Sequence, residues 1–418
     1  MLKDTSKLIK YIDAFAGEFY NINKVLSYNR PVEIITGPRS TGKSTMVAGY
    51  VLIYRVILGG RFLYTRRRQN EVDLTKSTFF NDAINIINAC NEKYDWWKFR
   101  ISYFDCVGHD YHMTVNYDDV NYETDIYDKN GDIIDETQEE RAARLEKETK
   151  DRCELCGRSI PLSVAGNVKS GFFVFDDDKC IDNIIFDEFI AEDQTGYLGS
   201  VNTPDTEFKK LMSLYVSADR KRGVARRNEI RLFLLGNMAN AYNPVLLKWN
   251  VNVYIMNTDN FRFIAPKDKF WVLEQPKPSK KAQEELKNSY QYQMMDESER
   301  KYNFENVARS GYYGNEFVRA KLPSDAHYIS GVIIGGNKYG VYHDDNGFIY
   351  INKWKSNAVT EATDIVSYAN GDANLLVMHW RDSPTLYEIH EKFLMKKLYF
   401  QNAKTQREFL QYLEFVPV

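Results

Sequence analysis

Short apolar runs alternate with longer mixed segments from about Val32 to Tyr254. The runs are rich in β-branched and aromatic residues and predict five strands: Val32–Ile35, Arg61–Thr65, Ile184–Phe186, Arg231–Leu235 and Val251–Met256. A helical run from Thr45 to Leu58 follows the first strand. Strands that alternate with helices predict an α/β fold with a largely parallel sheet, and we assign residues 1–256 to this domain.

An extra segment at residues 105–157 differs from its surroundings in composition. From Asp118 to Asp151 the chain is acidic and carries the hairpin turn signal Asn130-Gly131. The run from Glu139 to Lys150 predicts a charged helix. This segment is therefore expected to be an insertion in the sheet domain.

Two regions follow the sheet domain. Pro and Lys are dense at Glu274–Pro278 and a polar helical pattern comes next, which predicts a helical linker over residues 257–318. Residues 319–418 are expected to form a smaller α+β domain of short strands and tight turns. Its turns are expected at Gly335–Asn337 and Asp345–Gly347, and its helices near Glu388–Leu394 and Thr405–Leu413.

The composition of the 418 residues, 44% apolar and 27% charged, is that of a folded globular protein. A net charge of −3 provides no general attraction for a polyanion, so contacts with nucleic acid must come from local basic clusters. Such clusters occur at Arg66–Arg68, Arg220–Arg222 and Arg226–Arg227. Each is either a solvated surface run or a phosphate contact.

Five Cys in a chain of this length favour a reducing compartment over a disulfide framework. The first residues lack the apolar core of a signal peptide, and the longest apolar stretch, Val47–Leu58, contains Arg55 and is too short for a membrane span. We therefore expect a cytosolic protein that is not secreted and has no membrane role.

A glycine-rich motif of the form GxxxxGK[ST] stands between the first strand and the first helix. In such a P-loop, backbone N–H groups face phosphate oxygens and the helix N-terminus favours negative charge. Lys43 is expected to reach the β- and γ-phosphates of ATP, and the Ser44 hydroxyl is expected to bind Mg²⁺. The predicted ATP-binding residues are Gly37, Pro38, Arg39, Ser40, Thr41, Gly42, Lys43 and Ser44.

Two carboxylates follow the apolar run Ile184–Phe186. Asp187 is expected to hold Mg²⁺, and Glu188 is expected to act as the general base that activates water. The pair favours hydrolysis over transfer of a phosphoryl group to a small molecule. It is typical of ATPases with an additional strand that convert hydrolysis into motion.

Asn237 ends another apolar strand and is expected to sense the γ-phosphate or the attacking water, although a simple turn residue also fits the pattern. The basic segment Arg220–Arg227 precedes that strand. One of its arginines, Arg222 or Arg226, is a candidate finger that acts on the neighbouring subunit's nucleotide. A solvated loop and a DNA-facing patch are the alternatives.

Cysteines and histidines flank the extra segment. Cys106 and His109, with His112 nearby, precede it, and Cys153 and Cys156 close it. Cys106, His109, Cys153 and Cys156 would make an acceptable tetrahedral zinc set, while unrelated cysteines beside a hairpin are the competing interpretation.

Taken together and in this order, the motifs resemble the DNA packaging (encapsidation) ATPases of phi29-type small tailed bacteriophages. The residues that carry the resemblance are Gly37–Ser44, Tyr64–Arg67, Ile160–Val164, Lys169-Ser170, Ile185–Ile190, Leu235–Asn237, Asn243-Pro244, Gly340–Tyr342 and Gly347–Ile351. The family's finger position falls at Ala225, so a shift to Arg226 or the use of Arg222 must be assumed.

The resemblance implies a ring of five identical subunits that docks on the portal of a prohead and translocates double-stranded DNA. It implies that a basic residue near Lys169 reaches the neighbour's nucleotide. It leaves open whether a scaffold RNA joins the ring. It also implies that the protein acts in the host cytoplasm and transiently on the prohead.

By the same resemblance, residues 319–418 have a degenerate RNase H-like nuclease fold. An active nuclease needs clustered carboxylates, and the expected first strand, Ile329–Gly335, has none. Asp344, Asp345, Asp364 and Asp372 are explained by turn and surface positions. We therefore expect no nuclease activity. Phosphate contacts are expected instead from Lys338, Lys353, Lys355, Lys396 and Lys397.

Two other functions fit the same motifs less well. The chain could be a different P-loop enzyme acting on nucleic acid, such as a helicase or a terminase with a live nuclease, but the carboxylate missing from the first strand argues against the terminase. It could also be a nucleotide-gated assembly protein of the virion. Glu188 argues against that, because a binding module does not need a general base.

Overall fold

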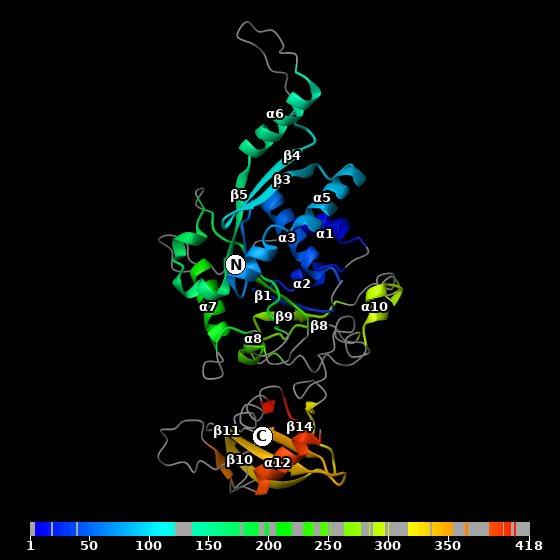
Figure 1. Cartoon of the computed structure of the whole chain (residues 1–418), viewed down its shortest axis with the longest axis vertical. Coiled ribbons are helices and arrows are strands. Elements are labelled where there is room, and N and C mark those ends of the chain that lie inside the picture. The colour runs from blue at the N-terminus through cyan, green and yellow to red at the C-terminus, as the bar shows by residue number, and fades with distance from the viewer. Residues whose placement is uncertain are drawn as a thin grey trace. The chain divides into compact units, whose positions relative to one another are not determined.

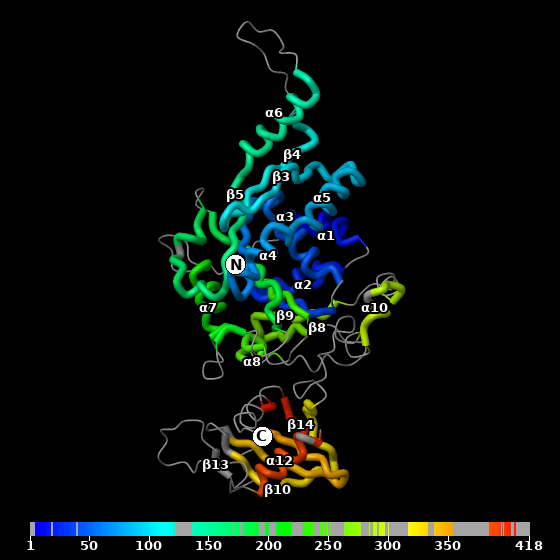
Figure 2. The backbone as a smooth tube through the Cα atoms, viewed as in Figure 1, coloured from blue at the N-terminus to red at the C-terminus, as the bar shows by residue number. Residues whose placement is uncertain are grey.

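The structure is a computed structural model that describes only part of the chain. The described residues are 5–17, 20–38, 41–120, 122, 136–175, 179–191, 197–199, 206–219, 229–237, 243–249, 251, 263–276, 284, 287–296, 300, 317–334, 337–353, 364–366, 384–395, 397–402 and 405–406. The chain divides into two units, shown in Figure 1 and traced in Figure 2. Unit 1 comprises Met1–Ile190, Thr206–Asn237 and Arg262–Met294, and unit 2 comprises Ala191–Asp205, Met238–Phe261 and Met295–Val418.

Unit 1 is built on a nine-stranded sheet with the order β3-β4-β5-β2-β6-β7-β1-β9-β8. The strands are β1 Val32–Thr36, β2 Phe62–Arg66, β3 Phe99–Val107, β4 Asp110–Tyr117, β5 Glu154–Pro161, β6 Asn183–Phe186, β7 Arg231–Gly236, β8 Phe263–Ile264 and β9 Trp271–Glu274. From β5 to β9 in this order every neighbouring pair is parallel. The strands β3, β4 and β8 add antiparallel edges. The predicted α/β fold with a largely parallel sheet is confirmed.

Four of the five predicted strands are confirmed as β1, β2, β6 and β7, each within one residue at either end. The fifth prediction, Val251–Met256, falls almost entirely outside the described residues. The sheet position beside β1 is filled by β9, which sequence reasoning missed. Glu274 ends this strand and is buried, so the stretch assigned to a Pro- and Lys-rich connection begins inside the sheet.

The helical segments of unit 1 are η1 Ser6–Leu8, α1 Ile9–Ala16, α2 Asn23–Ser27, α3 Lys43–Leu58, α4 Gln69–Thr75, α5 Asn81–Lys93, α6 Gln138–Asp151, η2 Leu162–Asn167, η3 Ser170–Phe173, α7 Thr206–Ala218 and α10 Tyr290–Met294. The helices α1, α3 and α5 share one apolar core with the sheet. A Cβ on Gly49 of α3 would lie 2.1 Å from the ring of Phe15, so only glycine lets α1 approach α3 this closely.

The extra segment begins within the hairpin of β3 and β4 and continues into α6, which Figure 1 shows extending beyond the hairpin. The predicted charged helix is confirmed, while the predicted turn at Asn130-Gly131 lies outside the described residues. No residue of α6 is buried. A capping box between Thr137 and Glu140 and the ion pairs Arg144–Glu148 and Lys150–Glu146 stabilise it instead.

Unit 2 contains a five-stranded sheet with the order β13-β10-β11-β12-β14. Its elements are α8 Pro244–Lys248, β10 His327–Ile334, β11 Asn337–His343, β12 Ile349–Lys353, β13 Asp364–Val366, α12 Pro384–Leu394 and β14 Leu398–Phe400. Leu386 and Ile389 of α12 pack on Val332 and other apolar residues of the sheet. The predicted turn at Asp345–Gly347 is confirmed, and α12 starts four residues before its predicted position.

Some predictions on unit 2 lie outside the described residues. They are the turn residues Gly335 and Gly336 and most of the predicted helix at Thr405–Leu413. No helix within the described ranges is long and apolar enough to cross a membrane.

A buried ion pair joins β1 to β7 inside unit 1. The guanidinium of Arg231 donates to the carboxylate of Glu33, and both side chains are almost inaccessible to solvent. Burial raises the pKa of Glu33 to about 7, while Arg231 works against the rise. The charge on Glu33 therefore depends on Arg231.

We expect Glu33→Ala to lower the free energy of unfolding by about 3–5 kcal/mol, because it leaves the charge of Arg231 buried without a counterion. Denaturant unfolding followed by tryptophan fluorescence measures this. The exposed pair Lys150–Glu146 provides the control, and Lys150→Ala should leave stability nearly unchanged. A Glu33→Leu/Arg231→Met double variant should recover most of the loss. Equal stability of Glu33→Ala and the wild type would contradict this account.

Candidate active site

The P-loop lies between β1 and α3. The N–H of Gly37 donates to the carbonyl of Gly236 at 3.1 Å, which ties the start of the loop to the end of β7. Gly42 has a φ of 81° and precedes the first helical residue, Lys43. This left-handed conformation favours glycine and lets the loop turn directly into the helix. Of the predicted ATP-binding residues, Arg39 and Ser40 lie outside the described part of the chain.

Lys43 and Ser44 reach the ends of two other strands. The ammonium of Lys43 is 2.8 Å from Oδ1 of Asn237 and 3.0 Å from the carbonyl oxygen of Pro38. The hydroxyl of Ser44 is 3.5 Å from Oδ1 of Asp187. The ends of β1, β6 and β7 thus bring together the residues proposed from sequence for phosphate binding, metal binding and sensing.

Arg66, at the end of β2, contacts both carboxylates that follow β6. Its Nε donates to Oδ2 of Asp187 at 3.0 Å, and its Nη1 lies 3.3 Å from Oε2 of Glu188. Burial disfavours the charge on Arg66, but the carboxylate of Asp187 outweighs this and raises the pKa of Arg66 above its ordinary value. Sequence reasoning treated Arg66 only as part of a basic cluster and a family motif. Arg66 ends a strand that neighbours β6, and this position is the signal from which its contact with the two carboxylates could have been predicted.

The neighbouring Arg67 holds the backbone of the same turn. Its guanidinium donates to the carbonyl oxygens of Glu188 and Phe189, and its Nε is 2.9 Å from the buried carboxylate of Glu207 on α7. Arg66 and Arg67 therefore bind carboxylates and carbonyls within unit 1. These contacts are within unit 1, and the role of the cluster in binding phosphate stays a prediction.

Glu188 combines an unusual backbone with an accessible side chain. Its φ of 55° lies in the left-handed region, which a non-glycine residue occupies only when its surroundings hold it there. The bonds from Arg67 supply that restraint. The Glu188 side chain is 63% exposed, so water can reach its carboxylate, which also lies within bonding distance of Arg66.

The residues proposed to act on a neighbouring subunit do not join this group. Lys169 is exposed just before η3, and its side chain makes no hydrogen bond with the described site residues. Arg222 and Arg226 lie outside the described residues, as do the other basic residues from Arg220 to Arg227. Their predicted roles are therefore not tested by this geometry.

The proposed zinc ligands are not gathered into one site. Cys156 is buried and its thiol lies 3.3 Å from the carbonyl oxygen of Tyr111, while the sulfur of Cys106 is 4.0 Å from the Ser159 hydroxyl. Burial raises the pKa of Cys156 to about 12, which opposes the thiolate that zinc requires. The described residues contain no group of three His, Cys, Asp or Glu side chains placed to hold a metal. The zinc site, including Cys153 and His109, remains a prediction without support from this geometry.

The candidate carboxylates of unit 2 have structural surroundings. Asp344 accepts hydrogen bonds from the N–H groups of Asn346 and Phe348 and from the hydroxyl of Tyr350. Burial opposes its charge, but these bonds lower the pKa of Asp344. Asp345 is an exposed turn residue, whereas Asp364 opens the strand β13. Asp372, Lys355 and Lys396 lie outside the described residues.

A family model for the podovirus DNA encapsidation protein matches residues 16–142. The DNA packaging proteins of Bacillus phages phi29 and PZA are each 22% identical to the chain, and each match covers 92% of the chain and 93% of the relative. A solved structure of the bacteriophage phi29 viral genome packaging motor assembly is similar in fold, with a TM-score of 0.55 and 19% identity over 95% of this chain and all of that one.

The chain is similar over almost its full length to these phage DNA packaging proteins. The resemblance inferred from the order of its motifs is confirmed. The two sequence matches span residues of both units.

Within this relative of the packaging ATPases, Lys43→Ala should weaken binding of nucleoside triphosphate by roughly tenfold to a hundredfold. The substitution removes a charge-assisted hydrogen bond of about 1.5–3 kcal/mol. Titration with a fluorescent ATP analogue measures it. Lys93→Ala, an exposed residue at the end of α5, is the matched control. Unchanged affinity in Lys43→Ala would remove the P-loop assignment.

Proposed function

We propose that this chain is the ATP-hydrolysing subunit of a viral DNA packaging motor, which couples hydrolysis to movement of double-stranded DNA into a phage prohead. The observation that carries the proposal is the contact of Lys43 with Asn237 and of Ser44 with Asp187 at the ends of three strands. The two relatives named DNA packaging protein support the same function.

The strand order supports an ATPase of the additional-strand class. The strand β7 lies between β1, which precedes the P-loop, and β6, which precedes Asp187 and Glu188. The additional strand, β7, brings Asn237 beside Lys43, where its amide can bond to a phosphate oxygen. Glu188, at the end of the neighbouring β6, would serve as the base.

The residues around Ser44 fit a bound Mg²⁺. A hydroxyl and a carboxylate oxygen are hard ligands of the kind that Mg²⁺ prefers, and Oδ1 of Asp187 faces Ser44 while Oδ2 is held by Arg66. When bound with ATP, Mg²⁺ would neutralise charge on the β- and γ-phosphate oxygens. The side chains of Ser44 and Asp187 would hold it.

The remaining chemistry belongs to protein side chains. The carboxylate of Glu188 accepts a proton from a water molecule, whose oxygen then attacks the γ-phosphorus as the bond to the leaving ADP oxygen breaks. Lys43 binds the phosphate chain, and Asn237 contacts the γ-phosphate or the attacking water. Arg66 holds Glu188 beside Asp187 before the nucleotide arrives.

Glu188→Gln should lower ATP turnover by about 10²- to 10⁴-fold, because an amide cannot accept the proton. Affinity for ATP should stay within a few-fold of the wild type, since the exposed side chain does not support the P-loop. Turnover is measured with and without double-stranded DNA, and DNA should stimulate the wild type. Glu136→Gln, beside the charged helix α6, is the control. Normal turnover in Glu188→Gln would assign the base to another residue.

We further propose that the protein works as a ring, of five subunits by its family resemblance, on the portal of the prohead in the host cytoplasm. An arginine from one subunit, Arg222 or Arg226, would stabilise charge at the neighbour's γ-phosphate, and Lys169 would lie near it. The exposure of Lys169 supports a role between subunits. The resemblance leaves open whether a scaffold RNA joins the ring.

Mixing subunits tests the action in trans. Arg222→Ala or Arg226→Ala should lower turnover while the isolated subunit still binds ATP, because the finger acts on the neighbour's nucleotide. Adding Lys43→Ala subunits, whose arginines are intact, should restore part of the activity under conditions where rings form. Lack of rescue for the variant that has lost turnover would contradict the trans role.

We propose that unit 2 is an RNase H-like domain without nuclease activity that binds nucleic acid. The antiparallel strands β10, β11 and β12, with β13 parallel beside β10, support this fold. The buried Val332 in the middle of β10, where a nuclease needs a carboxylate, supports the lack of cleavage. Lys338 and Lys353 are exposed on the described strands and remain candidates for phosphate contacts.

A further inference from the structure

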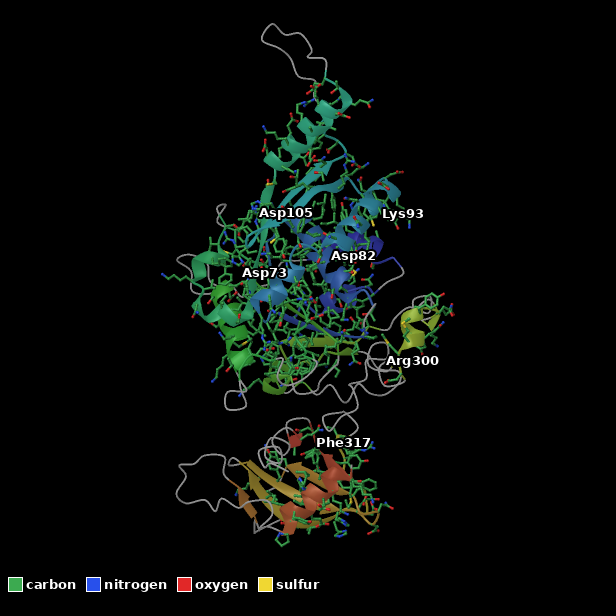
Figure 3. All side chains as sticks on the ribbon, in the orientation of Figure 1. Asp73, Asp82, Lys93, Asp105, Arg300 and Phe317 are labelled. Atoms are coloured by element: carbon green, nitrogen blue, oxygen red, sulfur yellow. The ribbon has the colours of Figure 1, made fainter. Side chains whose placement is uncertain are left out.

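A pocket of about 460 Å³ opens beside the first turn of α3. Three helices of unit 1 form its walls, and Figure 3 labels Asp82 on one of them, α5. Apolar side chains come from each helix: Phe15 from α1, Met46 from α3 and Ile86 from α5. A pocket of this size with mostly apolar walls and a few polar groups has the character of a small-molecule site.

Two polar side chains of α5 line the same pocket. Asp82 and Asn85 are three residues apart and therefore lie on one face of the helix. Both are exposed, and neither side chain forms a hydrogen bond or ion pair with the described residues. Their hydrogen-bonding groups are thus available to a ligand.

The pocket lies on one particular side of the P-loop. Gly42 and Thr45, which flank Lys43 and Ser44, contribute to its lining, whereas Asp187, Glu188 and Asn237 do not. The γ-phosphate belongs beside those three residues, because they supply the metal ligand, the base and the sensor. The other end of the nucleotide, its ribose and base, must leave the loop on the opposite side.

We propose that this pocket binds the base of the nucleotide and that Asn85 and Asp82 select adenine. The inference rests on the proposed function, since it requires phosphates in the P-loop. The amide of Asn85 can donate to a ring nitrogen and accept from the 6-amino group, and the carboxylate of Asp82 can only accept. Adenine offers a donor at position 6, where guanine has a carbonyl oxygen that Asp82 repels. The side chains of Phe15, Met46 and Ile86 supply apolar contact for the ring.

Equilibrium binding of ADP, GDP and inorganic pyrophosphate tests this without relying on turnover. The wild type should bind ADP about tenfold or more tightly than GDP. Asn85→Ala should weaken the binding of ADP by about tenfold and leave the affinity for pyrophosphate unchanged, because pyrophosphate contacts only the P-loop. Asp82→Asn, which adds a donor toward position 6, should shift the preference toward GDP. Ile86→Trp, which fills the pocket, should weaken the binding of both nucleotides and leave the affinity for pyrophosphate unchanged.

Asn81→Ala is the matched control, since Asn81 is an exposed residue of α5 that does not line the pocket. Equal affinities for ADP and GDP in the wild type, or ADP binding that survives Asn85→Ala and Ile86→Trp, would overturn the proposed pocket. The P-loop is tested separately by Lys43→Ala, which should weaken pyrophosphate as well. An unchanged affinity for pyrophosphate in Lys43→Ala would instead contradict the proposed function.

Discussion

Parallel pairing of β7 with both β1 and β6 is the constraint on which the site depends. Leu232 and Ile184 are in register, as are Leu232 and Val32, so the three strands end at nearly the same level. Because side chains at the carboxyl ends of parallel strands meet at one edge, Lys43, Asp187 and Asn237 converge there although up to 194 residues separate them. The apolar residues of these strands are buried, which fixes the register.

The positive charge of Arg66 lies against both carboxylates at this edge. Its guanidinium contacts Asp187 and Glu188, while the ammonium of Lys43 donates to the Pro38 carbonyl and to Oδ1 of Asn237. Two neighbouring carboxylates repel each other, and the guanidinium of Arg66 offsets this repulsion by bonding to both. Asp187 and Glu188, the proposed metal ligand and the proposed base, can therefore lie side by side at one strand end.

Much of this arrangement follows from sequence because the motifs are local. Gly37–Ser44 leads from the end of β1 into the start of α3, and Ile184–Glu188 contains the end of β6, so both the elements and the candidate residues could be predicted. The role of Arg66 could not, because its partners are 121 and 122 residues away and only the pairing of β2 with β6 brings them together. The strand β9 was missed for a related reason. Its four residues are apolar enough for a strand, but the adjoining Pro and Lys residues suggested a connection.

The same long-range pairing explains why Glu188 can hold a strained backbone. Its left-handed φ is disfavoured for a residue with a Cβ, so the turn needs external restraint. Arg67 provides it from β2, and the buried Glu207 on α7 fixes Arg67 in turn. The position of Glu188, the proposed general base, is thus held by a chain of contacts from the buried Glu207 on α7 through Arg67 to the turn after β6.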